Sequence, residues 1–439
     1  MNKKLPLWSV LLLLWFSGIL GLLFGWSVWR VDNGGSIVNN KTSHIVIFMA
    51  SFPTLVKQAF HEINQPSILV KPNRYPNIRG LVTERNYVDS NYLLLPFFDK
   101  ISKQSMVKLL RLSDQKILYQ WSPNFDELKN KLGNKNNYYT NTAKNNLMIN
   151  HPLLSPDGSI VFDSSPSPLV KIDKASKLVW IVKGNFNHSL EFDNSGNIWT
   201  PNFISPSNFS NKSLTHLKDD AITEVSPQGK VLFKKSVAEI LSQNGYRGLL
   251  LGTGRLETDL LHLNDVQPAL TSTKYWKTND LLISLRFKST VFLYRPSTNK
   301  ILWLQTGPWL NQHDVDFIDS TRIGVFGNDV IRTNTGEHLL NEYNEEYVFD
   351  FKTKKTTAPY TVFLKKAKVS TPSGGRSDIL PNGDLFIEET DNNRLLRGTT
   401  KDIIWQYEES IDRNSVSALS WTRFLTKSEY KKLMFLNNK

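Results

Sequence analysis

The chain contains no cysteine. This absence excludes disulfide bonds, thiolate nucleophiles, and zinc or iron–sulfur sites built on cysteine. It does not exclude a location outside the cytoplasm, because oxidising compartments permit disulfides without requiring them. A nucleophile or an anion-binding site in this protein must therefore use other side chains.

The sequence also lacks the glycine-rich motif G-x-x-x-x-G-K-[ST] that wraps nucleotide phosphates. A reaction driven by a nucleotide is therefore disfavoured. The formal net charge is +13, yet Lys and Arg are dispersed among Asp and Glu, with only small clusters such as Lys352-Thr353-Lys354-Lys355. Nucleic-acid binders gather their charge into a stripe or tail, so we expect no nucleic-acid partner. The excess favours anionic ligands or membrane lipid.

Only one long hydrophobic run is present, from Leu5 to Val31. It exceeds the roughly 20 residues that a bilayer requires, and Trp8, Trp26 and Trp29 lie near its ends, where indole rings favour the interface. Lys3 and Lys4 precede it, which predicts a single-pass anchor with a cytoplasmic N-terminus. The bulk of the chain would then be extracytoplasmic, in a periplasm or lumen.

A cleaved signal peptide is the competing interpretation of this run. Such peptides have a shorter apolar core and a small-residue exit, whereas here the run ends in Gly25-Trp26-Ser27-Val28-Trp29. An uncleaved signal anchor is therefore favoured. We expect residues 1–31 to form the cytoplasmic tip and transmembrane helix, residues 32–75 a linker, and residues 76–439 the main domain. The linker should hold a short helix at Thr54–Ile63, where apolar residues recur at helical spacing.

Two repeated patterns run through the main domain. The first is a polar turn with glycine followed by an apolar strand, and it is present around Gly158, Gly196, Gly229 and Gly383. The second is a turn followed by a strand that ends near tryptophan, at Trp121, Trp180, Trp303 and Trp405. Both patterns are typical of strands joined by tight turns.

Repeated four-stranded units of roughly 40 to 50 residues are typical of a β-propeller. The main domain has room for about six blades of that size, although the spacing is irregular. We therefore predict an all-β fold: a β-propeller that follows the N-terminal transmembrane helix in the sequence. A pair of β-sandwiches is the structural alternative.

Three histidines and one arginine have a context that suggests chemistry. His188, His262 and His313 each precede or enter an expected strand, and Arg286 lies in the strand Ile283–Phe287. In a propeller such positions can converge near the central channel. Three histidines allow a metal site like that of catalytic zinc, but an adjacent arginine opposes a cation. The same residues also suit transfer of an anionic sulfuryl or phosphoryl group, with imidazole as nucleophile and cations on the transferring oxygens.

These segments, in this order, resemble the arylsulfotransferase family that works without a nucleotide sulfate donor. The resemblance rests on the segments around His188, His262, Arg286 and His313, and extends to Leu380-Pro381-Asn382-Gly383 and Trp405-Gln406-Tyr407. It covers roughly residues 150 to 410. It implies a six-bladed β-propeller with the active site in the central channel. The chain departs from the family in lacking the cysteine pair that relatives often carry.

The resemblance also implies roles for individual residues. His313 would be the nucleophile that carries a transient sulfuryl group, and His262, Asn264 and Arg286 would bind the sulfate oxygens. His188 would orient the substrate or assist proton transfer to the phenol oxygen. From the turn Ser373-Gly374-Gly375-Arg376, Arg376 is a candidate second contact to the substrate anion. No cofactor and no metal are expected.

The resulting hypothesis is a membrane-anchored enzyme that moves a sulfuryl group from an aryl sulfate to a phenol through a sulfohistidine intermediate. Its partners would be phenolic or aryl sulfate small molecules and the membrane; a homo-oligomer or a membrane complex stays open. The alternative is a non-catalytic propeller that serves as a scaffold or subunit of a membrane or envelope complex. Histidines more than about 10 Å apart would favour the scaffold, because they could not share one reacting group.

Overall fold

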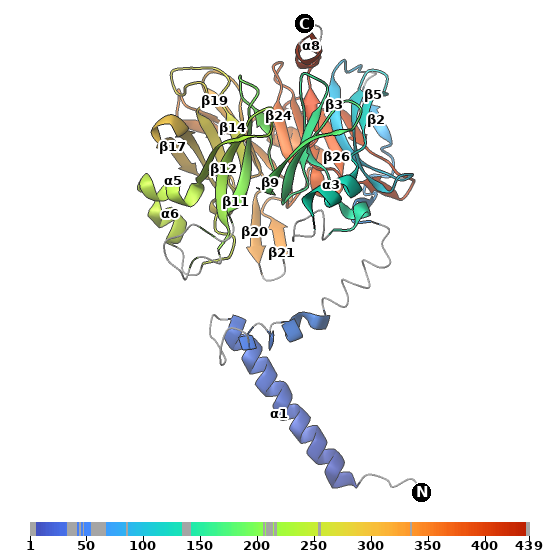
Figure 1. Cartoon of the computed structure of the whole chain (residues 1–439), viewed down its shortest axis with the longest axis vertical. Coiled ribbons are helices and arrows are strands. Elements are labelled where there is room, and N and C mark those ends of the chain that lie inside the picture. The colour runs from blue at the N-terminus through green and yellow to red at the C-terminus, as the bar shows by residue number, and fades with distance from the viewer. Residues whose placement is uncertain are drawn as a thin grey trace. The chain divides into compact units, whose positions relative to one another are not determined.

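The chain forms two compact units, Met1–Ser67 and Ile68–Lys439. The computed structural model describes residues 6–32, 42–43, 45–46, 48–53, 67–84, 87–133, 142–204, 207, 214, 217–252, 256–333 and 336–435. Figure 1 draws both units, which are described separately below.

The first unit is built on helix α1 (Leu7–Asp32). Its segment Leu7–Val31 is long and apolar enough to cross a membrane, and none of the apolar window is buried by the protein. A signal sequence has the same properties, so the helix does not by itself distinguish the two. Residues 48–53 are also helical. The helix expected at Thr54–Ile63 falls outside the described residues.

The second unit is all-β and has a propeller-like arrangement of sheets, in place of the alternative pair of sandwiches (Figure 1). Three sheets have four strands: β29 (Arg423–Leu425), β3 (Tyr92–Asp99), β4 (Gln104–Arg111) and β5 (Lys116–Trp121); β14 (Leu263–Pro268), β15 (Leu281–Leu285), β16 (Thr290–Arg295) and β17 (Lys300–Thr306); β18 (Asp314–Phe317), β19 (Arg322–Gly327), β22 (Glu345–Asp350) and β23 (Lys355–Thr357). A fourth sheet has five strands: β24 (Arg376–Ile379), β25 (Leu385–Glu389), β26 (Arg394–Gly398), β27 (Ile403–Glu408) and β2 (Gly80–Thr83).

The remaining large sheet has eight strands: β6 (Asn150–Leu154), β7 (Ile160–Asp163), β8 (Ser167–Ile172), β9 (Leu178–Phe186), β10 (Glu191–Phe192), β11 (Ile198–Ile204), β12 (Asp219–Val225) and β13 (Val231–Ser236). Among the described residues, four blades are therefore separate sheets, rather than the expected six. The difference arises where β9 meets β11, since the pairing of Phe186 with Asn202 merges the strands on either side into one sheet.

The two sequence repeats interlock neighbouring strands. The glycines of the first repeat have positive φ angles, 78° at Gly158 and 80° at Gly229, which glycine adopts without steric cost. Trp121 at the end of β5 donates its indole N–H to the carbonyl of Gly158 at 3.1 Å. Trp180 in β9 likewise donates to the carbonyl of Pro227, beside Gly229, at 3.0 Å. Each of these tryptophans thus fixes a turn of the following strands.

Short helices lie between or beside the sheets: α3 (Phe125–Leu132), α5 (Val237–Gln243), α6 (Arg247–Leu251), α7 (Thr361–Ala367) and α8 (Lys427–Phe435). Helix α3 begins at Asn124, whose side chain accepts a hydrogen bond from the N–H of Glu127, and it buries Phe125, Leu128 and Leu132. Two small sheets complete the set: β20 (Val330–Thr333) with β21 (Gly336–Leu339), and β1 (Val70–Pro72) with β28 (Ser415–Ser417).

The two ends of the second unit pair with each other. The C-terminal strand β29 is hydrogen-bonded to the early strand β3, with Phe424 opposite Leu93. Strand β2 pairs with β27, so that N-terminal residues also extend the last large sheet. Phe424 packs with Phe386 and Trp405, at ring-centroid distances of 5.2 and 6.4 Å. This pairing closes the arrangement of sheets.

We expect Phe424→Ala to destabilise the second unit by about 3–5 kcal/mol, because it removes a buried ring where the chain ends join. Urea unfolding followed by tryptophan fluorescence would measure the loss. Val179→Ala is the control: Val179 is 51% exposed, and its truncation should change the free energy of unfolding by less than about 0.5 kcal/mol. Equal effects of the two substitutions would contradict a closing role for Phe424.

Candidate active site

The structure brings the three predicted histidines together from separate parts of the chain. His188 lies between β9 and β10, His262 directly precedes β14, and His313 directly precedes β18. Their ring centroids are 5.2 Å (His188 to His262), 6.3 Å (His188 to His313) and 6.4 Å (His262 to His313) apart. The rings are therefore close enough to share one small ligand. Their separations are below the distance of about 10 Å beyond which the histidines could not share one reacting group.

Two of these histidines have an unusual backbone. The φ angle is 63° at His188 and 54° at His262, a left-handed conformation that costs a residue with a Cβ roughly 1 kcal/mol or more. Such conformations persist where the surrounding structure imposes them, and they often occur at functional sites. The centroids of both rings lie within 6.4 Å of the centroid of the His313 ring.

Each imidazole is oriented by an oxygen acceptor at Nδ1. Asn187 Oδ1 lies 2.8 Å from Nδ1 of His188, and Asp259 Oδ2 lies 2.7 Å from Nδ1 of His262. Asn328 Oδ1 lies 2.6 Å from Nδ1 of His313. Because each acceptor requires a donor, each ring carries a proton on Nδ1, and in a neutral ring Nε2 is then left with its lone pair.

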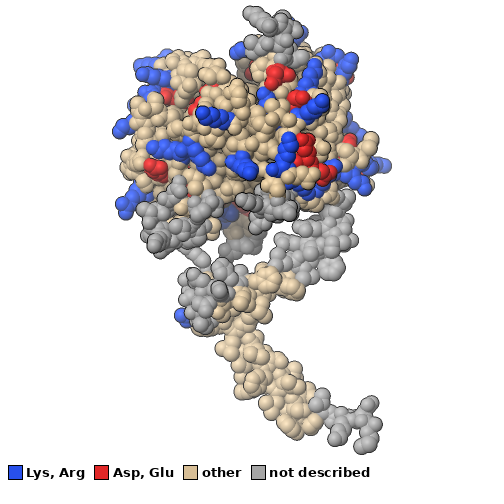
Figure 2. Space-filling view, viewed as in Figure 1, with Lys and Arg blue, Asp and Glu red and all other residues tan. Residues whose placement is uncertain are grey.

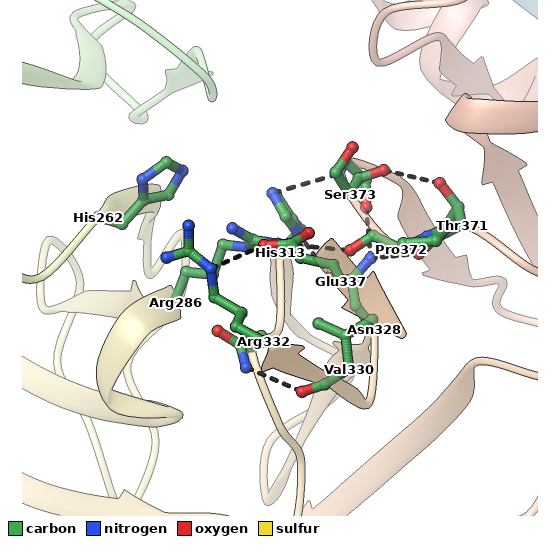
Figure 3. Close-up of polar contacts among 12 residues, drawn as sticks. His262, Arg286, His313, Asn328, Val330, Arg332, Glu337, Thr371, Pro372 and Ser373 are labelled. Atoms are coloured by element: carbon green, nitrogen blue, oxygen red, sulfur yellow. Dashed lines mark hydrogen bonds and ion pairs between the residues drawn. The ribbon is translucent and has the colours of Figure 1, made fainter. Parts of the chain in front are cut away.

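The orientation of Asn328 is itself fixed. Its Nδ2 donates to the carbonyls of Thr371 and Gly374, both at 2.8 Å, so its Oδ1 must face His313 (Figure 3). On the other side of the ring, Nε2 of His313 accepts the backbone N–H of Gly374 at 3.3 Å. His313 is thus held at both nitrogens, and the long Gly374 contact engages the Nε2 lone pair only weakly.

Burial and positive neighbours keep the rings of His188 and His313 neutral. Burial lowers the pKa of His313 well below its usual value, and the charge of Arg286 lowers it further, although the hydrogen bond with Asn328 raises it. Burial and nearby positive charge also lower the pKa of His188. A neutral ring with a lone pair at Nε2 is the form in which imidazole acts as a nucleophile or base.

Behind His262 lies a compact group of charges. Burial opposes ionisation of Asp259, but its hydrogen bonds with His262 and Lys218 prevail and lower its pKa to about 2. Lys218 lies 3.1 Å from both Asp259 and Asp220. Asp259 therefore stays ionised and holds the His262 ring. Carboxylates commonly orient functional histidines in this way, by accepting a hydrogen bond from the ring nitrogen that faces away from the ligand.

Arg286 begins the short helical turn Arg286–Lys288, which follows β15, and its side chain is only 6% exposed. Its Nη2 donates to Glu337 at 2.8 Å and to the carbonyl of Pro372 at 3.3 Å (Figure 3). Its Nε is buried and has no hydrogen-bond partner among the described residues. A buried donor without a partner is costly, so this N–H is suited to an anionic ligand.

Asn264 and Arg376 have other partners in the structure. Asn264 is fully buried, and its Nδ2 donates to the carbonyl of Gln312 at 2.7 Å. It therefore positions the residue before His313. Arg376 contacts Nε2 of His151 and Oδ1 of Asp378, each at 2.9 Å. Direct contact of these two residues with a substrate remains a prediction.

Sequence reasoning did not identify four residues of this site: Asp259, Asn328, Arg332 and Glu337. Asp259 precedes His262 by three residues, a spacing at which a turn brings side chains together, so the local sequence did hold a signal. Asn328 and Glu337 contact residues 15 and 51 positions away. No local pattern marks such pairs.

The three histidines also meet a geometric requirement for a metal ion, since one ring nitrogen from each lies within 4.8 Å of the others. Imidazoles whose Nδ1 is hydrogen-bonded to an oxygen are suited to bind zinc as well as to take part in group transfer. Arg286 weighs against the metal, because its positive charge already lowers the pKa of His313 and would repel a dication too. The electrostatics of the site favour an anion.

Residues 151–410 match the arylsulfotransferase (ASST) family. The chain belongs to this family. The match covers His188, His262, Arg286 and His313, and it confirms the resemblance inferred from their sequence segments. No curated protein matches the chain.

Several solved structures resemble this arylsulfotransferase family member distantly. A protein of unknown function from Bacteroides caccae is 13% identical, with 77% of this chain and 99% of that chain covered and a TM-score of 0.46. A functionally unknown protein from Desulfotomaculum acetoxidans is 10% identical, with 77% and 99% covered and a TM-score of 0.40. Virginiamycin B lyase from Staphylococcus aureus is 11% identical, with 76% and 89% covered and a TM-score of 0.38.

We expect the side chains of His188 and His313 to remain neutral when the pH is lowered to about 5.5, where a free imidazole is mostly protonated. Nitrogen NMR of histidine-labelled protein would detect this, with His188→Asn and His313→Asn assigning the signals. Because the pKa values in the fold lie below those of the unfolded chain, the contribution of these rings to stability is complete above about pH 6.5 and is lost as the pH falls below it. Protonation of either ring near pH 6.5 would contradict the neutral site.

Proposed function

We propose that the protein is a membrane-anchored arylsulfotransferase that moves a sulfuryl group from an aryl sulfate to a phenol by way of a sulfohistidine. The observation that carries the proposal is the orientation of His313: Asn328 holds its Nδ1–H at 2.6 Å, which leaves Nε2 as a lone pair beside two further imidazoles and Arg286. Membership of the arylsulfotransferase family supports the reaction class.

In the first half-reaction, Nε2 of His313 attacks the sulfur of the aryl sulfate. The nitrogen–sulfur bond forms as the bond from sulfur to the aryl oxygen breaks, and the phenolate leaves. Positive charge develops on the ring, and the hydrogen bond from Nδ1 to Asn328 stabilises it. The Nε–H of Arg286 and the backbone N–H of Gly374 are donors for the sulfuryl oxygens.

In the second half-reaction, a phenol replaces the phenolate. His188 is neutral and exposes Nε2, so we assign it as the base that takes the phenol proton. The phenol oxygen then attacks sulfur as the bond from sulfur to Nε2 of His313 breaks, and His188 afterwards releases its proton to solvent. His262, held by Asp259, completes the polar surroundings of the transferred group. The acceptors are phenolic small molecules, and the donors are aryl sulfates.

We infer that the propeller has six blades. The inner strands β6, β10, β14, β18, β24 and β29 each contribute a buried or half-buried charged or titratable residue to one polar centre: His151, Glu191, Asp265, Asp314, Arg376 and Arg423. Contacts such as Arg376 to His151 and Arg423 to Glu191 join residues of different inner strands. In this interpretation the eight-stranded sheet consists of two blades that merge only at Phe186 and Asn202.

The alternative of a non-catalytic scaffold receives less support. It would be favoured by histidines more than about 10 Å apart, whereas all three centroid distances are below 6.5 Å. On the face drawn in Figure 2, Lys and Arg are spread over the second unit, with fewer Asp and Glu between them, and do not gather into one patch. A small-molecule reaction in the interior accounts for the converging histidines better than a docking surface does.

We expect His313→Ala to reduce the transfer of sulfate from 4-nitrophenyl sulfate to phenol by at least about 10⁴-fold, because it removes the nucleophile. Release of 4-nitrophenol measures the rate, and circular dichroism checks the fold. His338→Ala is the control, since His338 is exposed on β21. Full activity of His313→Ala would refute the sulfohistidine, and loss of wild-type activity in a metal chelator would favour the metal site instead.

We also propose that α1 anchors the protein with its N-terminus in the cytoplasm. The full chain should then sediment with membranes, stay there in high salt, and dissolve in detergent, because its apolar helix is bound in the bilayer. Protease added to the extracytoplasmic side should reach the second unit. A soluble protein whose mature N-terminus lies beyond Val31 would show that the helix is a cleaved signal instead.

A further inference from the structure

A small hairpin contributes charge to the active site. Strands β20 and β21 form a two-stranded sheet of their own and are inserted between β19 and β22. Figure 1 shows the hairpin projecting beyond the ends of the neighbouring strands. Neither the repeats nor the catalytic proposal accounts for it. Its two charged side chains, Arg332 and Glu337, face Arg286 (Figure 3).

Glu337 bridges two arginines. One carboxylate oxygen lies 2.8 Å from Nη2 of Arg286, and the other lies 3.2 Å from Nε of Arg332. The guanidinium of Arg332 lies over the ring of Phe287, 4.4 Å from its centroid, and that ring is 4.5 Å from His262. Glu337 is only 21% exposed, whereas Arg332 is 54% exposed. The carboxylate therefore lies at the edge of the buried site.

The bridge sets the charge that a ligand meets. Arg286, Arg332 and Glu337 together carry one net positive charge. His188 and His313 add none, because burial keeps their pKa values low. Behind His262, Lys218 contacts Asp259 and Asp220. Burial raises the pKa of Asp220 and so opposes its ionisation, which leaves Lys218 to balance the ionised Asp259. A single negative charge on the ligand thus balances the two arginines and Glu337.

Sulfate esters and phosphate monoesters differ in this respect. An aryl sulfate carries one negative charge, whereas a phosphate monoester carries about −1.5 to −2 at neutral pH. Their shapes and oxygen acceptors are otherwise alike, so shape alone separates them poorly. The second charge of the phosphate would face the Glu337 carboxylate without a cation to balance it.

We propose that Glu337 is a specificity-determining residue that selects monoanionic sulfate esters over dianionic phosphate monoesters. This inference rests on the proposed sulfuryl transfer and names the charge class of its substrate. Glu337 already forms ion pairs with Arg286 and Arg332, so an incoming anion meets one net positive charge rather than two. Without the carboxylate, the arginines would present two positive charges and would match a dianion.

The test compares two unreactive ligands on the full-length, detergent-solubilised protein. Benzenesulfonate carries one charge, and phenyl phosphate carries two at about pH 8. Calorimetry gives the dissociation constant of each, and the ratio of the two constants reports charge selection. We expect the wild-type protein to bind the sulfonate more tightly.

Glu337→Gln should shift this ratio toward phenyl phosphate on the order of tenfold, since it removes one negative charge at a partly exposed position. Arg332→Gln should shift the ratio the opposite way, because it removes a positive charge and leaves Glu337 in place. Glu342→Gln is the matched control: Glu342 is an exposed glutamate that follows the hairpin, and its substitution should leave the ratio unchanged.

A purely structural role for Glu337 would weaken both ligands equally and leave the ratio constant, and that result would overturn the proposal. If Glu337→Gln fails to fold, Arg332→Gln tests the proposal by itself: a shift of the ratio toward benzenesulfonate supports it, and an unchanged ratio overturns it. Turnover of 4-nitrophenyl sulfate is measured in parallel. Turnover without a change of ratio refutes the charge selection alone, whereas a change of ratio without turnover refutes the transfer reaction alone.

Discussion

The pairing of β29 with β3 is the constraint on which the rest of the second unit depends. The candidate site is assembled from three loops that belong to different parts of the sheet arrangement, and no two of its histidines are closer than about 50 residues in the chain. Sheets that were free to open would let these loops separate. Closure through Phe424 and its aromatic neighbours therefore determines whether the histidines can act together, although it lies in none of the loops that carry them.

Within the closed arrangement, the site is defined by oriented lone pairs more than by charge. Three side-chain oxygens orient the three imidazoles through their Nδ1 atoms. Burial lowers the pKa values of His188 and His313 and so keeps these two rings neutral. Arg286 and Arg332 supply positive charge beside the rings, and Glu337 bridges the two arginines. Such a site can receive an anion and offer it a nucleophile without a large charge of its own.

Much of this arrangement could be read from the sequence. The turns that contain glycine and the strands that end near tryptophan predicted a propeller, because each repeat is a local pattern. The order of the histidine segments predicted the family. The number of separate sheets could not be read, because it depends on a single long-range pairing between Phe186 and Asn202. Asn328 and Glu337 were missed for the same reason: they act on residues that folding, not sequence, brings near. Asn264 and Arg376 were predicted as substrate contacts, but the partners they have in the fold could not be foreseen.

The left-handed backbone at His188 and His262 implies that stability and the proposed catalysis favour different residues at these two positions. Glycine would adopt the same φ angles without steric cost. Variants of this chain selected only for resistance to heat would therefore tend to lose these histidines first, and would keep the propeller while losing the chemistry. In a set of related chains, glycine or asparagine at these positions would then mark the members that have become binding proteins or scaffolds.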